Sequence, residues 1–208
     1  MRTGALTAVI LMVSALGLRA EQVNQKFALE GVTLTYDTES LSQNSEIEGE
    51  DVEVFGTLLR QHPEIERIVL NSSGGSVWAA MEIARLMLDF DLETEVDGEC
   101  SSACVNIFLA GERRGMAAGS SMGFHLRTWS PPAVERYYED WKGEEGWNSP
   151  FEFASWIYED TQAEVFDDLV YLVSRGVDAD FAIRIKTPRA RTWYPSRQEL
   201  MQAGILTK

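Results

Sequence analysis

An alternation of short apolar runs and amphipathic segments between residues 51 and 126 constrains the fold most strongly. Apolar residues at helical spacing predict helices, and short alternating or continuous apolar runs predict strands. Strands that alternate with helices pair in parallel, so the pattern predicts an α/β fold built from stacked βαβ units around a parallel sheet. The expected strands are 32–36, 68–70, 92–96 and 122–126, and the expected helices are 51–61, 77–90, 102–110 and 196–202.

Two details of this pattern make sharper predictions. The continuous apolar run Ile68-Val69-Leu70 is typical of a strand buried on both faces. Asp97-Gly98 follows the next strand and predicts a turn before the helix at 102–110.

Residues 127–189 differ in composition from the rest of the chain. They combine many aromatic and acidic side chains with few aliphatic ones up to residue 160. We expect a partly helical insertion within a single domain over 21–208. It is either a satellite hydrophobic cluster or a lid or peptide-binding face.

Residues 1–20 have the pattern of a secretory signal. Arg2 precedes an apolar stretch from Ala5 to Leu18, and cleavage is expected after Ala20. The stretch is shorter than the roughly 20 residues of a spanning helix, although an uncleaved anchor is the alternative. The sequence therefore predicts a periplasmic or secreted protein with no stable membrane insertion after cleavage.

The net charge of −15 argues against nucleic acid as a partner, because such a surface repels phosphate groups. Neither the cysteine spacing nor the two histidines indicate a zinc site, and His62, beside Pro63, is expected on the surface. We expect no metal or other cofactor.

Three turns in the predicted α/β region carry residues suited to chemistry. A Gly74-Gly75 turn follows the strand at 68–70, Ser102 precedes the helix that follows 92–96, and His125 lies near the end of the strand at 122–126. Each feature alone is weak, but their order and similar spacing are specific.

These residues suit acyl transfer. A serine becomes a useful nucleophile when a positioned base takes its proton, and His125 is the candidate base for Ser102. The N–H groups of Gly75 and Ala103 are candidates for an oxyanion hole, since glycine allows a close backbone approach and Ala103 opens a helix.

At these motifs the chain resembles the ClpP/crotonase superfamily, and within it small exported bacterial proteins related to ClpP-like serine peptidases. The resemblance covers about 45–126 well and 190–207 loosely. It implies a crotonase/ClpP-like core with Ser102 as nucleophile, His125 as base, and Gly75 with Ala103 as oxyanion donors. It also implies a peptide or protein substrate and a homo-oligomer.

The sequence departs from the ClpP pattern where the third triad member is expected. Thr192 occupies the position of the usual aspartate when the chain is aligned through Gly204. We therefore expect Thr192 or a backbone carbonyl beside the far nitrogen of His125. Other open sources of activation are four carboxylates and a Ser–Lys dyad. The carboxylates are Asp167, Asp168, Asp178 and Asp180, and the candidate lysines are Lys142 and Lys186.

The two cysteines, Cys100 and Cys104, flank Ser102. Positions four apart in a regular helix hold Cβ atoms about 5–6 Å apart, too far for a disulfide, but Cys100 is expected before the helix begins. Export favours a disulfide. Two buried thiols and a catalytic Cys100 remain alternatives.

Two functions from different classes follow. The first is an exported, ATP-independent serine hydrolase, a peptidase with an atypical or missing third triad member. The second is a non-catalytic binding or scaffold protein that kept the fold and lost activity. An acyl-CoA enzyme is disfavoured by export and by the acidic charge.

Overall fold

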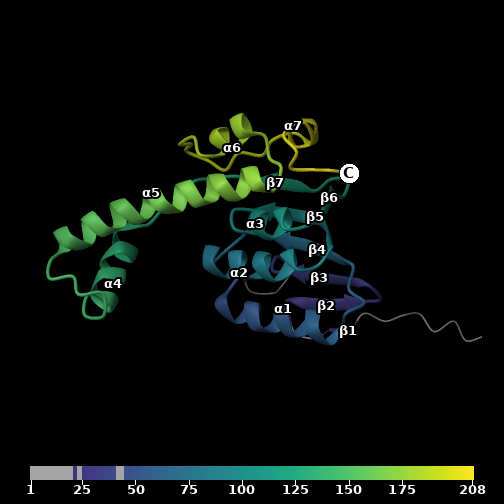
Figure 1. Cartoon of the computed structure of the whole chain (residues 1–208), viewed down its shortest axis with the longest axis horizontal. Coiled ribbons are helices and arrows are strands. Elements are labelled where there is room, and N and C mark those ends of the chain that lie inside the picture. Colours follow the sequence, from purple (N-terminus) through teal and green to yellow (C-terminus); the bar gives the residue numbers. More distant parts are fainter. Residues whose placement is uncertain (1–20, 23–24, 41–44) are drawn as a thin grey trace, which may run out of the picture.

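The computed structural model of the chain describes residues 21–22, 25–40 and 45–208 (Figure 1). The expected signal at 1–20 lies outside these residues. No helix in the described ranges combines the length and the apolar character needed to span a bilayer.

The core is a seven-stranded sheet in the order β1-β2-β3-β4-β5-β6, with β7 also paired to β5. β3 to β7 pair in parallel, whereas β1, β2 and β3 pair antiparallel at one edge. The predicted α/β fold with a mostly parallel sheet is therefore confirmed. The strands are β1 (Glu21–Gln22), β2 (Phe27–Glu30), β3 (Thr33–Asp37), β4 (Arg67–Ser72), β5 (Glu93–Ser101), β6 (Arg113–Met116) and β7 (Ser121–Gly123).

Three helices, α1 (Gly49–Gln61), α2 (Val77–Leu88) and α3 (Cys104–Leu109), stack on one face of the sheet (Figure 1). Side chains of β4 consequently alternate, with Ile68 and Leu70 buried and Val69 only half-buried. The expectation that this strand is buried on both faces is wrong, because helices cover only one of them.

The predicted turn at Asp97-Gly98 is also wrong, because β5 continues through it as a bulge. Pairing with β4 shifts from Leu70 opposite Val96 to Ser72 opposite Cys100. Gly98 has φ of 118°, and a Cβ there would lie 2.3 Å from Asn71 Oδ1. The bulge divides β5 into a first half that pairs with β6 and a second half that pairs with β7 and carries the strand to Ser101.

Much of the segment 127–189 is helical, and its residues 129–174 form what we call the arm. α5 (Pro150–Ser174) leaves the body as a 25-residue helix, and α4 (Pro131–Trp141) lies near its far end (Figure 1). Both helices begin with a serine whose side chain accepts a hydrogen bond from the third backbone N–H, followed by proline at the first helical position. At this length α5 spans about 37 Å.

The root of the arm is fixed to α3. The Tyr171 hydroxyl donates to the Asn106 carbonyl at 2.8 Å, and Arg175 Nε donates to the Leu109 carbonyl at 2.8 Å. Burial raises the pKa of Tyr171 to about 12, so this hydroxyl keeps its proton at neutral pH. Two short helices, α6 (Ala179–Ile185) and α7 (Arg197–Gln202), complete the fold.

Candidate active site

Ser102 occupies a sharp turn between β5 and α3. Its φ is 55°, and among the described residues it is the one non-glycine residue with a positive φ. Its backbone N–H donates to the Gly123 carbonyl of β7 at 3.0 Å, which holds the turn against the sheet. A strained serine on a strand-to-helix turn is a recurrent way to expose a nucleophilic hydroxyl.

Two backbone N–H groups near this turn have no acceptor in the described part of the chain, those of Gly75 and Ala103. Ala103 lines the pocket that also contains Ser102, whereas Gly75 does not line it among the described residues. The backbone of Gly75 is instead held by Ile47, which donates to the Gly74 carbonyl and accepts from the Ser76 N–H, both at 2.8 Å.

Gly74 packs directly against the serine turn, which the sequence did not indicate. A Cβ on Gly74 would lie 2.8 Å from Ser102 Cβ and 3.2 Å from Ala103 N, and its φ is 116°. Any side chain there would displace the serine turn, so glycine is required by both space and conformation.

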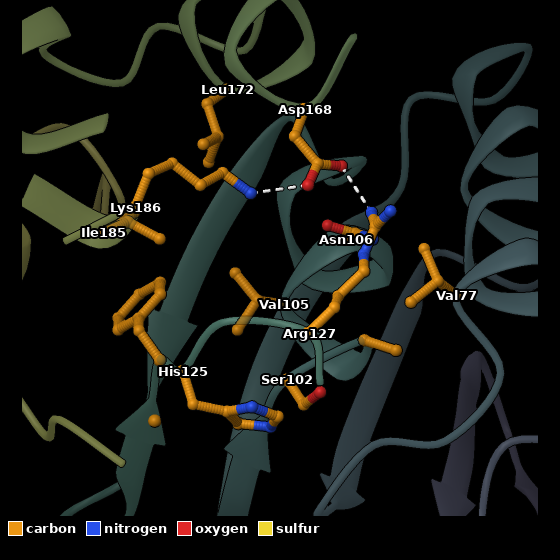
Figure 2. Close-up of a pocket in the computed structure, with 13 residues that line it drawn as sticks. Val77, Ser102, Val105, Asn106, His125, Arg127, Asp168, Leu172, Ile185 and Lys186 are labelled. Carbon is orange, nitrogen blue, oxygen red and sulfur yellow. Dashed lines mark hydrogen bonds and ion pairs between the residues drawn. The ribbon is translucent and has the colours of Figure 1, made fainter. Parts of the chain in front are cut away.

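His125 follows β7 and lines the same pocket as Ser102. In Figure 2 its imidazole projects toward Ser102, although no hydrogen bond joins the two side chains among the described residues. His125 Nδ1 is 2.8 Å from the carbonyl oxygen of Leu126. Because a carbonyl can only accept, Nδ1 carries the proton and Nε2 keeps its lone pair, the form a general base needs.

Thr192 lies near His125 but is not bonded to it. Both residues line a shallow second hollow beside the segment that follows α6. This segment is held to the site by a two-way backbone pair between Phe124 and Trp193, at 2.9 and 2.8 Å. The far nitrogen of the imidazole is therefore partnered by a backbone carbonyl, and within the described ranges no carboxylate is bonded to it.

The Ser102 pocket is a narrow cleft of about 60 Å³ whose far wall carries charge. Asp168 of α5 accepts from Arg127 at 2.7 Å and from Lys186 at 2.5 Å (Figure 2). Arg127 also pairs with Glu164 at 2.9 Å. Sequence reasoning missed the presence of Arg127 here and did not favour Lys186. These residues come from three separate segments, and no local motif connects them.

The other candidate acids and the second candidate lysine are engaged elsewhere. Asp178 caps α6 by accepting from the Phe181 N–H at 2.9 Å, and Asp167 and Asp180 are exposed. Lys142 pairs with Glu139 in the arm at 2.6 Å. Asp168 and Lys186 are thus the two of these candidates that reach the pocket, and they are bonded to each other.

Cys100 and Cys104 form a disulfide, as predicted. Cys100 lies in β5 and Cys104 opens α3, so the bond spans the turn that holds Ser102. Both residues are fully buried. The alternatives of two thiols and of a catalytic Cys100 are wrong, because neither sulfur is free.

Besides the disulfide, hydrogen bonds to Glu99 connect the serine turn to the C-terminal segment. Ser101 Oγ donates to Glu99 Oε1 at 2.5 Å, and the Tyr194 hydroxyl donates to the same oxygen at 2.8 Å. The bond to Glu99 raises the pKa of Tyr194 above its usual range. Within the described ranges no group of three or more His, Cys, Asp or Glu side chains is placed to hold a metal ion.

Comparison with known proteins supports the fold. No family model matches the sequence, and no curated protein matches it. Among solved structures, a point mutant of ClpP1 from Listeria monocytogenes superposes with a TM-score of 0.58 at 18% identity, covering 85% of this chain and 89% of that one. The chain therefore has a ClpP-like fold, with a likeness in structure rather than in sequence.

Proposed function

We propose that the chain is an exported, ATP-independent serine hydrolase, a peptidase, in which Ser102 is the nucleophile and His125 the base. The observation that carries this proposal is the left-handed backbone of Ser102 in a pocket shared with His125, next to the unpaired N–H of Ala103. Backbone strain of this kind concentrates at functional sites, because the surrounding structure must hold it in place.

In the proposed reaction His125 Nε2 takes the hydroxyl proton as Ser102 Oγ attacks the carbonyl carbon of a peptide bond. The oxyanion accepts hydrogen bonds from the N–H groups of Ala103 and Gly75, and collapse of the intermediate passes the proton from His125 to the leaving amine. Water then hydrolyses the acyl-enzyme by the same route. Since Ser102 and His125 are not yet hydrogen-bonded, substrate binding has to bring them together.

Turnover is expected to be slow. The carbonyl of Leu126 fixes the tautomer of His125, but a neutral oxygen stabilises an imidazolium far less than a carboxylate does. In well-studied triads, altering the aspartate lowers turnover by about 10⁴. This missing charge is also the observation that favours the second candidate function, a non-catalytic binding protein on the same fold.

Export is part of the proposal. The disulfide beside Ser102 supports an oxidising compartment, because such bonds are rare in the cytosol. We therefore place the protein in the periplasm or outside the cell, with residues 1–20 removed.

The decisive experiment is labelling with a fluorophosphonate, which reacts with activated serines. The protein is purified from the periplasmic fraction, where its N-terminal residue is expected to be Glu21, and the labelled residue is mapped by mass spectrometry. We expect a label on Ser102, none on Ser102→Ala, and slower labelling of His125→Gln. Ser73→Ala, which removes an exposed hydroxyl from the neighbouring turn, is the matched control and is expected to label normally.

An unlabelled wild-type protein with its disulfide intact would contradict the peptidase and leave the binding protein as the function. A label on any other serine would also contradict it. Recovery of the chain only from the cytosol, with Met1 retained, would overturn export.

A further inference from the structure

The arm contains a separate hollow between α4 and α5. Its volume is about 580 Å³, and most of its wall is apolar. The apolar residues that form it include Trp129, Pro131, Val134, Tyr138, Phe153 and Ile157. Trp129 is 50% exposed at this hollow, so its indole offers a contact surface that the fold itself leaves uncovered.

A cluster of aromatic rings lies behind the hollow. Tyr137 of α4 contacts aromatic rings of the segment before α4 and of α5. The centroid distances are 5.1 Å to Trp129, 6.1 Å to Phe153 and 6.0 Å to Trp156. Trp147, in the loop between the helices, packs against Phe153 in a tilted arrangement, with the ring centroids 4.8 Å apart. Aromatic side chains have few rotatable bonds, so a cluster of this kind presents its surface with little loss of entropy on binding.

The charge around the hollow is predominantly negative. The arm contains eleven Asp and Glu residues and two basic residues, Arg136 and Lys142. Two carboxylates line the hollow itself, those of Glu135 and Glu139. Glu139 pairs with Lys142, whereas Glu135 has no ion pair among the described residues.

We propose that this hollow binds a cationic amphipathic polypeptide segment. An apolar side chain of the segment enters between Trp129 and Phe153, and an adjacent lysine or arginine pairs with Glu135 and lies near the ring of Trp129. The acidic surface of the arm attracts such a segment and repels an acidic one. The apolar contact therefore provides the affinity, and the charge selects cationic segments over acidic ones.

The position of the hollow links it to Ser102, and this part of the inference rests on the proposed function. α5 lines both sites, with Ile157 at the hollow and Asp168 at the Ser102 pocket. Eleven helical residues cover about 16 Å, a span that about five extended peptide residues cross. A substrate anchored in the hollow would thus reach the wall of the Ser102 pocket formed by Asp168 about five residues away.

Binding is tested on full-length Ser102→Ala, so that no cleavage interferes. The probe is a fluorescein-labelled synthetic 12-residue peptide of alternating leucine and lysine, followed by fluorescence anisotropy. Two matched peptides replace every lysine by glutamate or every leucine by serine. We expect binding of the leucine–lysine peptide alone, because the site selects for both properties.

Variants of the hollow then locate the site. Trp129→Ala is expected to weaken binding about tenfold, as for a central aromatic anchor. Glu135→Gln is expected to weaken binding about threefold. The difference in affinity between this variant and its parent is expected to disappear in about 0.5 M salt, because salt screens the charge of Glu135. Because Glu135 is exposed, this second variant keeps the test valid if Trp129→Ala disturbs the arm, which circular dichroism would reveal.

The controls are Phe151→Ser and Glu144→Gln, which alter an exposed apolar and an exposed acidic side chain of the same arm outside the hollow. An equal loss in the controls would mean general adhesion to an acidic, apolar arm and would overturn the proposal. So would a hollow occupied by a second copy, seen in sedimentation as a dimer that Trp129→Ala dissociates. If the peptide binds but Ser102 is not labelled by fluorophosphonate, this inference is supported and the peptidase proposal is contradicted. If Ser102 is labelled but the peptide does not bind, the peptidase proposal is supported and this inference is contradicted.

Discussion

Around Ser102 the backbone is held by the main sheet, whereas in the arm two helices hold each other through aromatic rings. The serine turn rests on Gly74 and Gly123 and on a layer of fully buried aliphatic and aromatic side chains in α3. The arm has no such layer: α4 has no buried residue, and α5 has two, Phe153 and Leu172. The pocket near the serine has a volume of about 60 Å³, whereas the hollow in the arm has a volume of about 580 Å³.

In the proposed function, this difference separates a site for the reaction from a site for peptide binding. Strained backbone needs a rigid support on every side, which only the main core provides. A binding surface needs exposed aromatic area and charge, which a core would bury. α5 connects the two regions because its C-terminal end is fixed to α3 by Tyr171 while its N-terminal half is outside the core.

The largest expected effect is a difference in the free energy of unfolding between substitutions in the core and in the arm. Phe108→Ala removes a fully buried ring of α3 and is expected to lower the free energy of unfolding by about 3–5 kcal/mol. Tyr137→Ala removes the central ring of the arm and is expected to change that free energy by less than about 1 kcal/mol, while amides of α4 lose their protection from hydrogen exchange.

Urea denaturation gives the global value, and hydrogen exchange gives the local one. If Tyr137→Ala destabilises the whole chain as much as Phe108→Ala does, the arm and the core unfold as one unit. The comparison between the two regions would then fail.

The next effect is a loss of stability at alkaline pH that comes from two tyrosines outside the arm's hollow. Burial raises the pKa of Tyr36 and of Tyr171, and Tyr36 also donates to Asp51 Oδ2 at 2.6 Å. The unfolded chain loses these protons near pH 10 while the folded chain keeps them, so their contribution to stability is complete below pH 10 and declines above it. At pH 11 the loss is about 1.4 kcal/mol for each tyrosine.

Urea midpoints measured from pH 8 to pH 11 check this slope. Tyr36→Phe is expected to be less stable at pH 8 and to lose less stability on the way to pH 11. An identical slope in wild type and Tyr36→Phe would show that Tyr36 ionises as readily in the folded state as in the unfolded one.

The smallest effect on stability is expected from the disulfide. Cys100 and Cys104 are four residues apart, so the closed loop is very short, and the entropic gain lies below the roughly 3 kcal/mol of a 15-residue loop. Reduction is therefore expected to lower the melting temperature by less than about 8 °C. It is expected to change the rate of fluorophosphonate labelling at Ser102 and to leave peptide binding by the arm unaltered.

Calorimetry, labelling and anisotropy on oxidised and reduced protein measure these three quantities. A larger fall in melting temperature would make the disulfide a support for the whole fold rather than for the serine turn. A change in peptide binding would show that the two regions are coupled.

The sequence was most informative where local periodicity and tertiary position agree. α1 and α2 lie close to their predicted ranges, because an apolar stripe at helical spacing has to face the sheet. The strand at 68–70 and the turn at Asp97-Gly98 were misjudged for one reason: neighbouring strands decide which faces are covered and where a strand bulges. The helices of the arm lacked an aliphatic stripe, and their signal was the pair of Ser-Pro starts at Ser130 and Ser149.

By itself the sequence determined the α/β class, the order of the three turns and the candidate roles of Ser102, His125 and the two cysteines. These depend on residue types within short segments, where spacing along the chain translates directly into geometry. Only the tertiary structure decided that the Leu126 carbonyl is the partner of His125, that Gly74 packs against Ser102, and that Asp168 brings Arg127 and Lys186 to one wall. Apart from the contact between the neighbours His125 and Leu126, these contacts join positions up to 41 apart, from Arg127 to Asp168, and distance along the chain carries no information about them until the core has packed.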